Sequence, residues 1–311
     1  MLTEILNIKH PIIMAPMFLV SNTKMVCEAM NNGIAGCIPA LNYRTLEELK
    51  EALVFLKQNK PKHGAFGFNL IVNKSNPKYK QQLNIICEMG CDFIITSLGN
   101  PAETIQLAKP KGIKVFCDVT DLKFAQKVEH LGADAIIAVN NLAGGHRGHF
   151  SPNKLIQTIK TTCKIPIISA GGVSCKSHVE EMMSLGYNGV SVGSPFIAST
   201  ESDVSIEYKN ACVNFGKSDI VMTSRISGTP CTVINTPYVK KIGTELSGFE
   251  RYFLKHPLLK KWAKMLRFIL GSIQITNAAK KATYKTLWVA GPSIENTTKI
   301  ESVKQIINRL I

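Results

Sequence analysis

Short apolar runs alternate with helical segments along this chain. Eight such runs start roughly 20 to 32 residues apart, a spacing that fits one strand, one helix and two loops per unit. Because the runs are continuous rather than alternating, both faces of each strand should be buried, as in a parallel sheet covered by helices. The predicted strands are Pro11–Ala15, Gly36–Ile38, Ala65–Asn69, Phe93–Ser97, Lys114–Cys117, Ala135–Val139, Ile167–Ala170 and Gly189–Val192.

The segments between these runs have the pattern of amphipathic helices. Thr45–Gln58 places its leucines on one face, and Asp121–Leu131 begins with an N-capping Asp and ends before Gly132. Eight strand–helix units predict a (β/α)8 barrel. The alternative is an open doubly wound sheet, which requires a Gly-x-Gly-x-x-Gly turn after the first strand. This chain has Ala15-Pro16-Met17-Phe18 there, so we favour the barrel.

Past residue 200 the pattern changes, and we predict three parts. Residues 1–218 form the barrel, 219–299 form a mixed and helical basic subdomain over the active-site side, and 300–311 form a helix that packs back on the barrel. The net charge is +15, and residues 239–285 supply +9 of it through eleven Lys or Arg and two Glu. A solvated helical face and a docking surface for an acidic carrier both fit this segment. No recognised nucleic-acid module accompanies the charge, so we exclude nucleic acid as a partner.

Cysteine usage and hydropathy indicate a cytoplasmic protein. The nine cysteines include no Cys-x-x-Cys pair and sit in apolar runs, as is typical of buried thiols in a reducing compartment. Cys87 and Cys91 fall on one face of a predicted helix, and we interpret them as packing residues rather than metal ligands. No stretch of about 18 apolar residues occurs, so a membrane span is not expected.

In a barrel the working residues lie at the C-terminal ends of the strands and in the loops that follow. Two glycine turns stand out, because phosphate sites form after the seventh and eighth strands of such barrels. Gly171-Gly172 and Gly193-Ser194 leave backbone N–H groups open to phosphate oxygens. The candidate site positions at these strand ends are Ala15, Pro16, Met17, Asn69, Ser97, Asp118, Ala143, Gly144, Gly145, Gly171, Gly172, Gly193 and Ser194.

His146 is the strongest candidate for proton transfer. It follows the sixth strand within Ala143–Gly148, where glycines on both sides leave the imidazole accessible to a flat ligand. The Gly-x-Ser-x-Gly pattern of hydrolases also occurs, at Gly189–Gly193. Its serine lies inside a predicted strand rather than at a strand-to-helix elbow, which argues against a hydrolase.

A specific combination of segments runs from the first strand to the C-terminal region: PIIMAPM (11–17), GFN (67–69), TSLGNP (96–101), AGGHRG (143–148), SAGGV (169–173), VGSPF (192–196) and AGP (290–292). With these segments the chain resembles the nitronate monooxygenases, formerly 2-nitropropane dioxygenases. That family shares its fold with the flavin-dependent enoyl-acyl-carrier-protein reductase II enzymes. The resemblance implies an FMN-binding (β/α)8 barrel with a smaller C-terminal helical subdomain.

The resemblance also implies roles for single residues. It places FMN contacts at Ala15, Pro16, Met17, Asn69, Gly171, Gly172, Gly193 and Ser194, and the catalytic histidine at His146. Two positions depart from the family pattern. Asn140-Asn141-Leu142 stands where many relatives have an acidic or serine-containing stretch, and Asp118 stands where relatives often carry Lys or a Pro-Ser pair. A carboxylate at residue 118 would disfavour negative charge on a reduced flavin.

The implied activity is the oxidation of alkyl nitronates with O2 to carbonyl compounds and nitrite. His146 would act as base toward a neutral nitroalkane or, when protonated, hold the nitronate anion. The alternative on the same scaffold is an NAD(P)H-dependent reductase of enoyl-acyl carrier protein or of quinones, with an acidic acyl carrier as partner. The sequence leaves the physiological substrate and a homodimeric state open.

Overall fold

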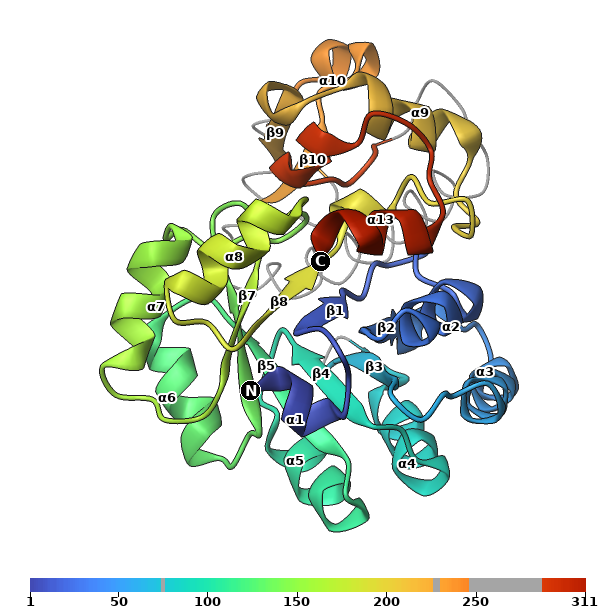
Figure 1. The fold of residues 1–311 in the computed structure, drawn as a ribbon, viewed down its shortest axis with the longest axis vertical. Coiled ribbons are helices and arrows are strands. Elements are labelled where there is room, and N and C mark those ends of the chain that lie inside the picture. Colours follow the sequence, from blue (N-terminus) through green and yellow to red (C-terminus); the bar gives the residue numbers. More distant parts are fainter. Residues whose placement is uncertain (74–75, 226–229, 246–286) are drawn as a thin grey trace, which may run out of the picture.

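Eight parallel strands close into a barrel in the computed structural model, which describes residues 1–73, 76–225, 230–245 and 287–311 (Figure 1). The strands follow one another around the barrel in chain order, and β1 closes the ring by pairing with β8. The predicted (β/α)8 fold is therefore confirmed. The strands are β1 Ile12–Met14, β2 Ala35–Pro39, β3 Ala65–Ile71, β4 Phe93–Ser97, β5 Lys114–Val119, β6 Ala135–Val139, β7 Ile167–Ala170 and β8 Gly189–Val192.

Helices surround the barrel and cover the outer faces of its strands. α3 shows why they start where they do, because Thr45 caps it by accepting a hydrogen bond from the Glu48 N–H at 3.1 Å. The last helix, α13, packs against α2 and α8 and completes the ring. The helices are α1 Leu2–Leu6, α2 Thr23–Asn31, α3 Leu46–Gln58, α4 Tyr79–Met89, α5 Ala102–Ala108, α6 Leu122–His130, α7 Pro152–Lys160, α8 Lys176–Ser184, α9 Ile206–Asn214, α10 Pro237–Ile242 and α13 Val303–Leu310.

The barrel interior is a separate apolar core from the layer beneath the helices. Along each strand, side chains alternate between the two, so that Phe93 and Ile95 point inward while Ile94 belongs to the outer layer. Phe93 and Phe116 stack inside the barrel with their ring centroids 5.4 Å apart. This alternation decides which residues at the strand ends face the barrel axis.

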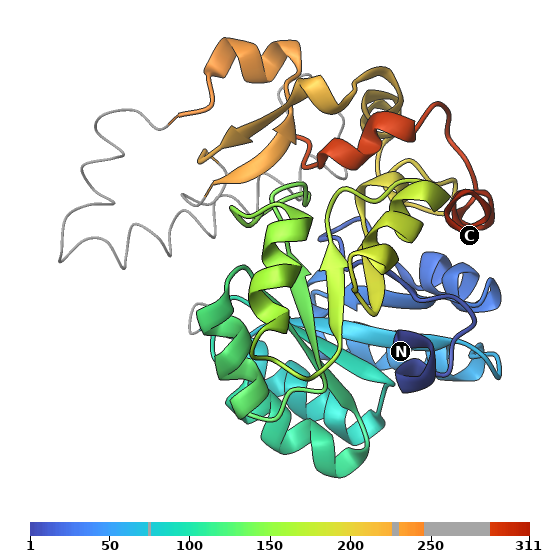
Figure 2. The same cartoon turned by 60° about the vertical axis from the view of Figure 1, so that its left-hand side comes forward.

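A two-stranded antiparallel hairpin lies beyond one end of the barrel, with α10 beside it (Figure 2). Its strands are β9 (Ile220–Thr223) and β10 (Cys231–Ile234). The hairpin and α10 fall within the segment 219–299 that we predicted to be a subdomain. Most of the basic and aromatic residues predicted for that segment lie at 246–286, outside the described residues.

One predicted helix ends earlier than expected. α4 stops at Met89 because Gly90 adopts φ +81°, so Cys91 lies outside the helix and its Sγ donates to the Phe93 carbonyl. The prediction that Cys87 and Cys91 share a helix face was therefore wrong. Among the described residues, no helix combines the length and hydropathy that crossing a membrane requires.

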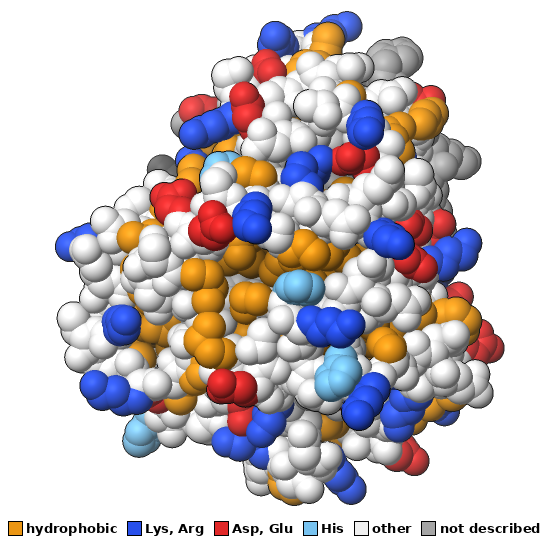
Figure 3. Space-filling view, viewed as in Figure 1, with side chains coloured by type: hydrophobic (Ala, Val, Ile, Leu, Met, Phe, Trp, Pro, Cys, Tyr) orange, Lys and Arg blue, Asp and Glu red, His pale blue; other side chains and the backbone are white. Residues whose placement is uncertain are grey.

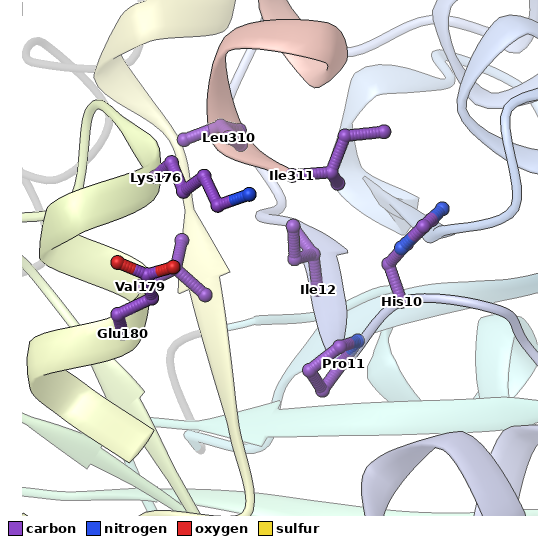
Figure 4. A pocket seen from close by; sticks show the side chains of 8 residues that line it. All are labelled: His10, Pro11, Ile12, Lys176, Val179, Glu180, Leu310 and Ile311. Atoms are coloured by element: carbon purple, nitrogen blue, oxygen red, sulfur yellow. The ribbon is translucent and has the colours of Figure 1, made fainter. Parts of the chain in front are cut away.

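A shallow hollow of about 300 Å3 lies on the outer wall, between α8 and α13, with the start of β1 as its floor. Figure 3 shows apolar side chains gathered on this face, and Figure 4 shows Ile12 and Pro11 facing Val179 and Leu310 across the hollow. The hollow lies at the start of β1, whereas Ala15, Pro16 and Met17 follow the other end of that strand, and no candidate site residue lines the hollow. The hollow is therefore separate from the candidate active site.

Candidate active site

Three polar side chains form the top layer of the barrel interior. Asn69, Ser97 and Asp118 are in phase with the inward residues of β3, β4 and β5, and each lies at or near the C-terminal end of its strand. Sequence reasoning placed Asp118 after the fifth strand. The structure extends β5 to Val119, so Asp118 is a strand residue opposite Ile137 of β6.

These three side chains form one hydrogen-bonded chain. The Asn69 amide donates to the Ile95 carbonyl at 3.1 Å and to Ser97 Oγ at 2.8 Å, and Ser97 Oγ donates to Asp118 Oδ2 at 2.5 Å. Both N–H bonds of the Asn69 amide are thereby directed into the barrel wall. The Asn69 side chain can therefore offer a ligand only its carbonyl oxygen, an acceptor.

Asp118 is a half-buried acid with one compensating hydrogen bond. Burial raises the pKa of the Asp118 carboxyl to about 6, and the hydrogen bond from Ser97 opposes that rise. The carboxyl group therefore changes its charge close to neutral pH, at the base of the candidate site.

This carboxyl predicts a pH-dependent effect of Asp118→Asn on stability. The ionised form is costly in the folded protein only, so the free energy of unfolding should fall as pH rises from about 4 to 6. Asparagine keeps an acceptor for Ser97 and carries no charge. The variant should be more stable than the parent at pH 8 by about 1–2 kcal/mol, a value reduced for solvent near the group, and equal to it near pH 4.

Urea denaturation of both proteins from pH 4 to 8 measures this difference. Asp121→Asn is the matched control, because Asp121 caps α6 on the surface and asparagine caps equally well. A stability difference for Asp118→Asn that is constant between pH 4 and 7 would contradict a raised pKa.

The loops after β6, β7 and β8 pack against one another through their glycines. A Cβ on Gly144 would lie 2.9 Å from both Ser194 Oγ and the Gly291 nitrogen, and the Gly291 N–H donates to Ser194 Oγ at 2.9 Å. A Cβ on Gly171 would lie 2.4 Å from the Ala143 nitrogen, and one on Gly172 would lie 2.8 Å from Leu142. Loop packing therefore accounts for these glycines, a reason that the sequence analysis, which assigned Gly171 and Gly172 to a phosphate site, did not give.

Backbone N–H groups are nevertheless available at this rim. Among the hydrogen bonds of the described residues, none is donated by the N–H of Gly172, Gly193 or Ser194. Gly193 faces the turn after β1, since a Cβ there would lie 3.5 Å from Ala15 and 3.6 Å from Met17. The structure thus brings the loops after β1, β7 and β8 together around free donors, the arrangement that binds an anion.

His146 lies in the loop after β6, directly after Gly145. Its side chain is exposed on one side, while the surrounding protein partly desolvates it and lowers the pKa of the imidazole below its ordinary value. A lowered pKa keeps the ring neutral, and so able to accept a proton, at physiological pH.

Several residues that shape the site were not predicted. Asn140 is fully buried at the base of the His146 loop and accepts from the Leu142 N–H at 2.7 Å. Ser21 Oγ accepts from the Met17 N–H at 2.9 Å and so fixes the turn after β1. Gly291 lies in the AGP segment, whose match to the family was the one available signal. No pattern in the sequence pointed to Thr232, whose side chain contacts the backbone of Gly145.

The fold is a (β/α)8 barrel, and its candidate site lies at the C-terminal ends of the strands. A family model described as nitronate monooxygenase matches residues 70–311. A probable nitronate monooxygenase from Staphylococcus saprophyticus is 27% identical, covering 77% of this chain and 79% of the relative. An indene-carboxyl-CoA dehydrogenase from Rhodococcus jostii is 26% identical, covering 78% and 67%. The chain belongs to the nitronate monooxygenase family and is a flavin-dependent oxidoreductase of that family.

Solved structures share the fold of this chain. FabK from Thermotoga maritima superposes with a TM-score of 0.84 at 27% identity, covering 99% of this chain and 94% of FabK. Nitroalkane oxidase from Streptomyces ansochromogenes superposes with a TM-score of 0.82, covering 99% and 96%, and at 18% identity it supports the fold alone.

Proposed function

We propose that the protein is an FMN-dependent nitronate monooxygenase that oxidises alkyl nitronates with O2 to carbonyl compounds and nitrite. The observation that carries the proposal is the position of His146, a partly desolvated imidazole on a glycine loop beside a rim of free N–H donors. A base and an anion-binding rim at the same end of one barrel suit a substrate with an acidic C–H bond and a phosphorylated cofactor.

The residues present fit FMN. The N–H groups of Gly172, Gly193 and Ser194 would hold its phosphate. Asn69, Ser97 and Asp118 would contact the flavin ring, and FMN, when bound, would supply the electron chemistry with nitronate and O2. We propose as further contacts Ala15, Pro16, Met17, Ala143, Gly144, Gly145 and Gly171.

Two groups of the chain would handle protons and charge. His146 takes the proton from a neutral nitroalkane when its imidazole is neutral, and holds a nitronate anion when it is protonated. Asp118 loses its negative charge as pH falls below about 6, which removes a charge that would oppose electron density on the cofactor. Asn69 presents an acceptor, because Ser97 and Ile95 hold both of its N–H groups.

The test is turnover of the FMN-loaded protein with nitronate and with NADH. We expect oxygen uptake and nitrite release with ethyl nitronate, and slow flavin bleaching when NADH is mixed anaerobically. Fast bleaching by NADH without oxygen uptake on nitronate would overturn the proposal in favour of the reductase alternative. A protein that takes up no FMN would overturn both.

The reactants, the oligomeric state and the location complete the proposal. We propose a small nitronate or nitroalkane and O2 as reactants, a homodimer, and an acidic acyl carrier only under the reductase alternative. All nine cysteines are free thiols and most are buried, as expected of a protein in the reducing cytoplasm.

A further inference from the structure

The β9–β10 hairpin contacts the barrel at the residue that precedes His146. The Thr232 N–H of β10 donates to the Gly145 carbonyl at 2.9 Å, and Thr232 Oγ1 accepts from the Gly145 N–H at 2.8 Å. One residue of the hairpin thus binds both backbone polar groups of Gly145. Thr232 is only 1% exposed, so its side of these hydrogen bonds is shielded from water.

Gly145 needs such support more than another residue would. It has φ +76° and is preceded by Gly144, and a Gly-Gly segment loses much conformational freedom when it becomes ordered. Gly144 is held on its other side by the Ser194–Gly291 contact. Between this contact and His146, the two bonds to Thr232 hold the backbone of residue 145.

The hairpin is itself well anchored. All four residues of β10 are buried, β10 pairs along its length with β9, and Val233 forms a bridge with Val289 on its other side. The Gly145 backbone is therefore tied to a small packed sheet outside the barrel rather than to another loop.

We propose that Thr232 is a positioning residue for His146, and that the hairpin aligns the histidine loop from outside the barrel. This inference rests on the proposed role of His146. A displacement of an imidazole by about 1 Å can cost 100-fold in rate, so losing one anchor of residue 145 should lower turnover more than substrate binding.

The test compares three threonine variants in the FMN-loaded protein. Thr232→Val keeps the shape and removes the hydroxyl, which accepts from the Gly145 N–H and also donates to the Gly145 carbonyl at 3.5 Å. We expect kcat with a nitroalkane to fall about 10-fold or more while KM changes less than about twofold. Thr232→Ser keeps a hydroxyl and should restore most of kcat. Thr223→Val is the matched control, because Thr223 is an equally buried threonine of the same hairpin whose hydroxyl donates to the Thr244 carbonyl instead.

A second readout does not depend on turnover. The imidazole Cε1–H signal of His146, assigned by its absence in His146→Asn, is followed by NMR from pH 5 to 8. We expect Thr232→Val to shift or broaden this signal and to change its titration midpoint, whereas Thr223→Val leaves both unchanged. Unchanged kcat and an unchanged His146 signal in Thr232→Val would overturn the inference. If the parent protein does not turn over nitroalkanes, the proposed function fails, while the NMR comparison still tests the contact.

Discussion

His146→Asn is expected to lower kcat/KM for a neutral nitroalkane by about 10²- to 10⁴-fold, the usual contribution of a general base. The loss with a preformed nitronate should be much smaller, about tenfold, because no proton has to be removed from that substrate. Stopped-flow or oxygen-electrode assays with nitroethane and ethyl nitronate give the two values side by side. His149→Asn is the control, since His149 is an exposed histidine three residues along the same loop.

The two substrates should also have opposite pH profiles. A base works only when neutral, so kcat/KM for the nitroalkane should rise with pH and level off above a pKa that lies below the ordinary histidine value. A protonated imidazole attracts an anion, so kcat/KM for the nitronate should decline as pH rises through the same pKa. Equal losses for both substrates in His146→Asn would show that the histidine is structural rather than a base.

The barrel could be predicted from the sequence because its signal is repeated. Strands such as Ala135–Val139 and Ile167–Ala170 are buried on both faces, and their continuous apolar runs distinguish them from the strands of a one-sided sheet. The ends of strands were less certain, because local propensity competes with tertiary pairing there. An aspartate is unfavourable in a strand, yet pairing of Asp118 with Ile137 keeps it in β5 and points it into the barrel.

The site could be predicted only as far as it follows from strand order. The loops after β7 and β8 contain Gly171, Gly172, Gly193 and Ser194. The C-terminal ends of all strands of a (β/α)8 barrel lie at one face, so strand order alone places these residues together. The contact of Thr232 with Gly145 joins residues 87 positions apart, and no periodicity or motif links them. Contacts between a barrel loop and an added hairpin depend on how the two segments pack together, and the local sequence pattern of neither segment indicates that packing.

Gly171 has a packing role in the structure that the sequence did not indicate, and this role predicts the effect of a substitution. Gly171 has φ +117°. A Cβ at this position would lie 2.4 Å from the Ala143 nitrogen and 2.5 Å from Asn140 Oδ1. Neither neighbour can move easily, because both residues are buried at the base of the His146 loop. Gly171→Ala should therefore destabilise the protein by about 2–4 kcal/mol and displace the loop toward the phosphate rim.

Gly112→Ala separates the two causes of that loss. Gly112 has φ +75° with no atom within 4 Å of a Cβ, so alanine there meets backbone strain of about 1 kcal/mol without a clash. Urea denaturation of the apo-proteins and FMN titration by fluorescence quenching measure stability and cofactor affinity separately. We expect Gly112→Ala to bind FMN as the parent does and Gly171→Ala to bind it at least about tenfold more weakly, since the rim that holds the phosphate is displaced. Equal stability and equal FMN affinity in the two variants would mean that the loops after β6 and β7 are not packed as tightly as their glycines indicate.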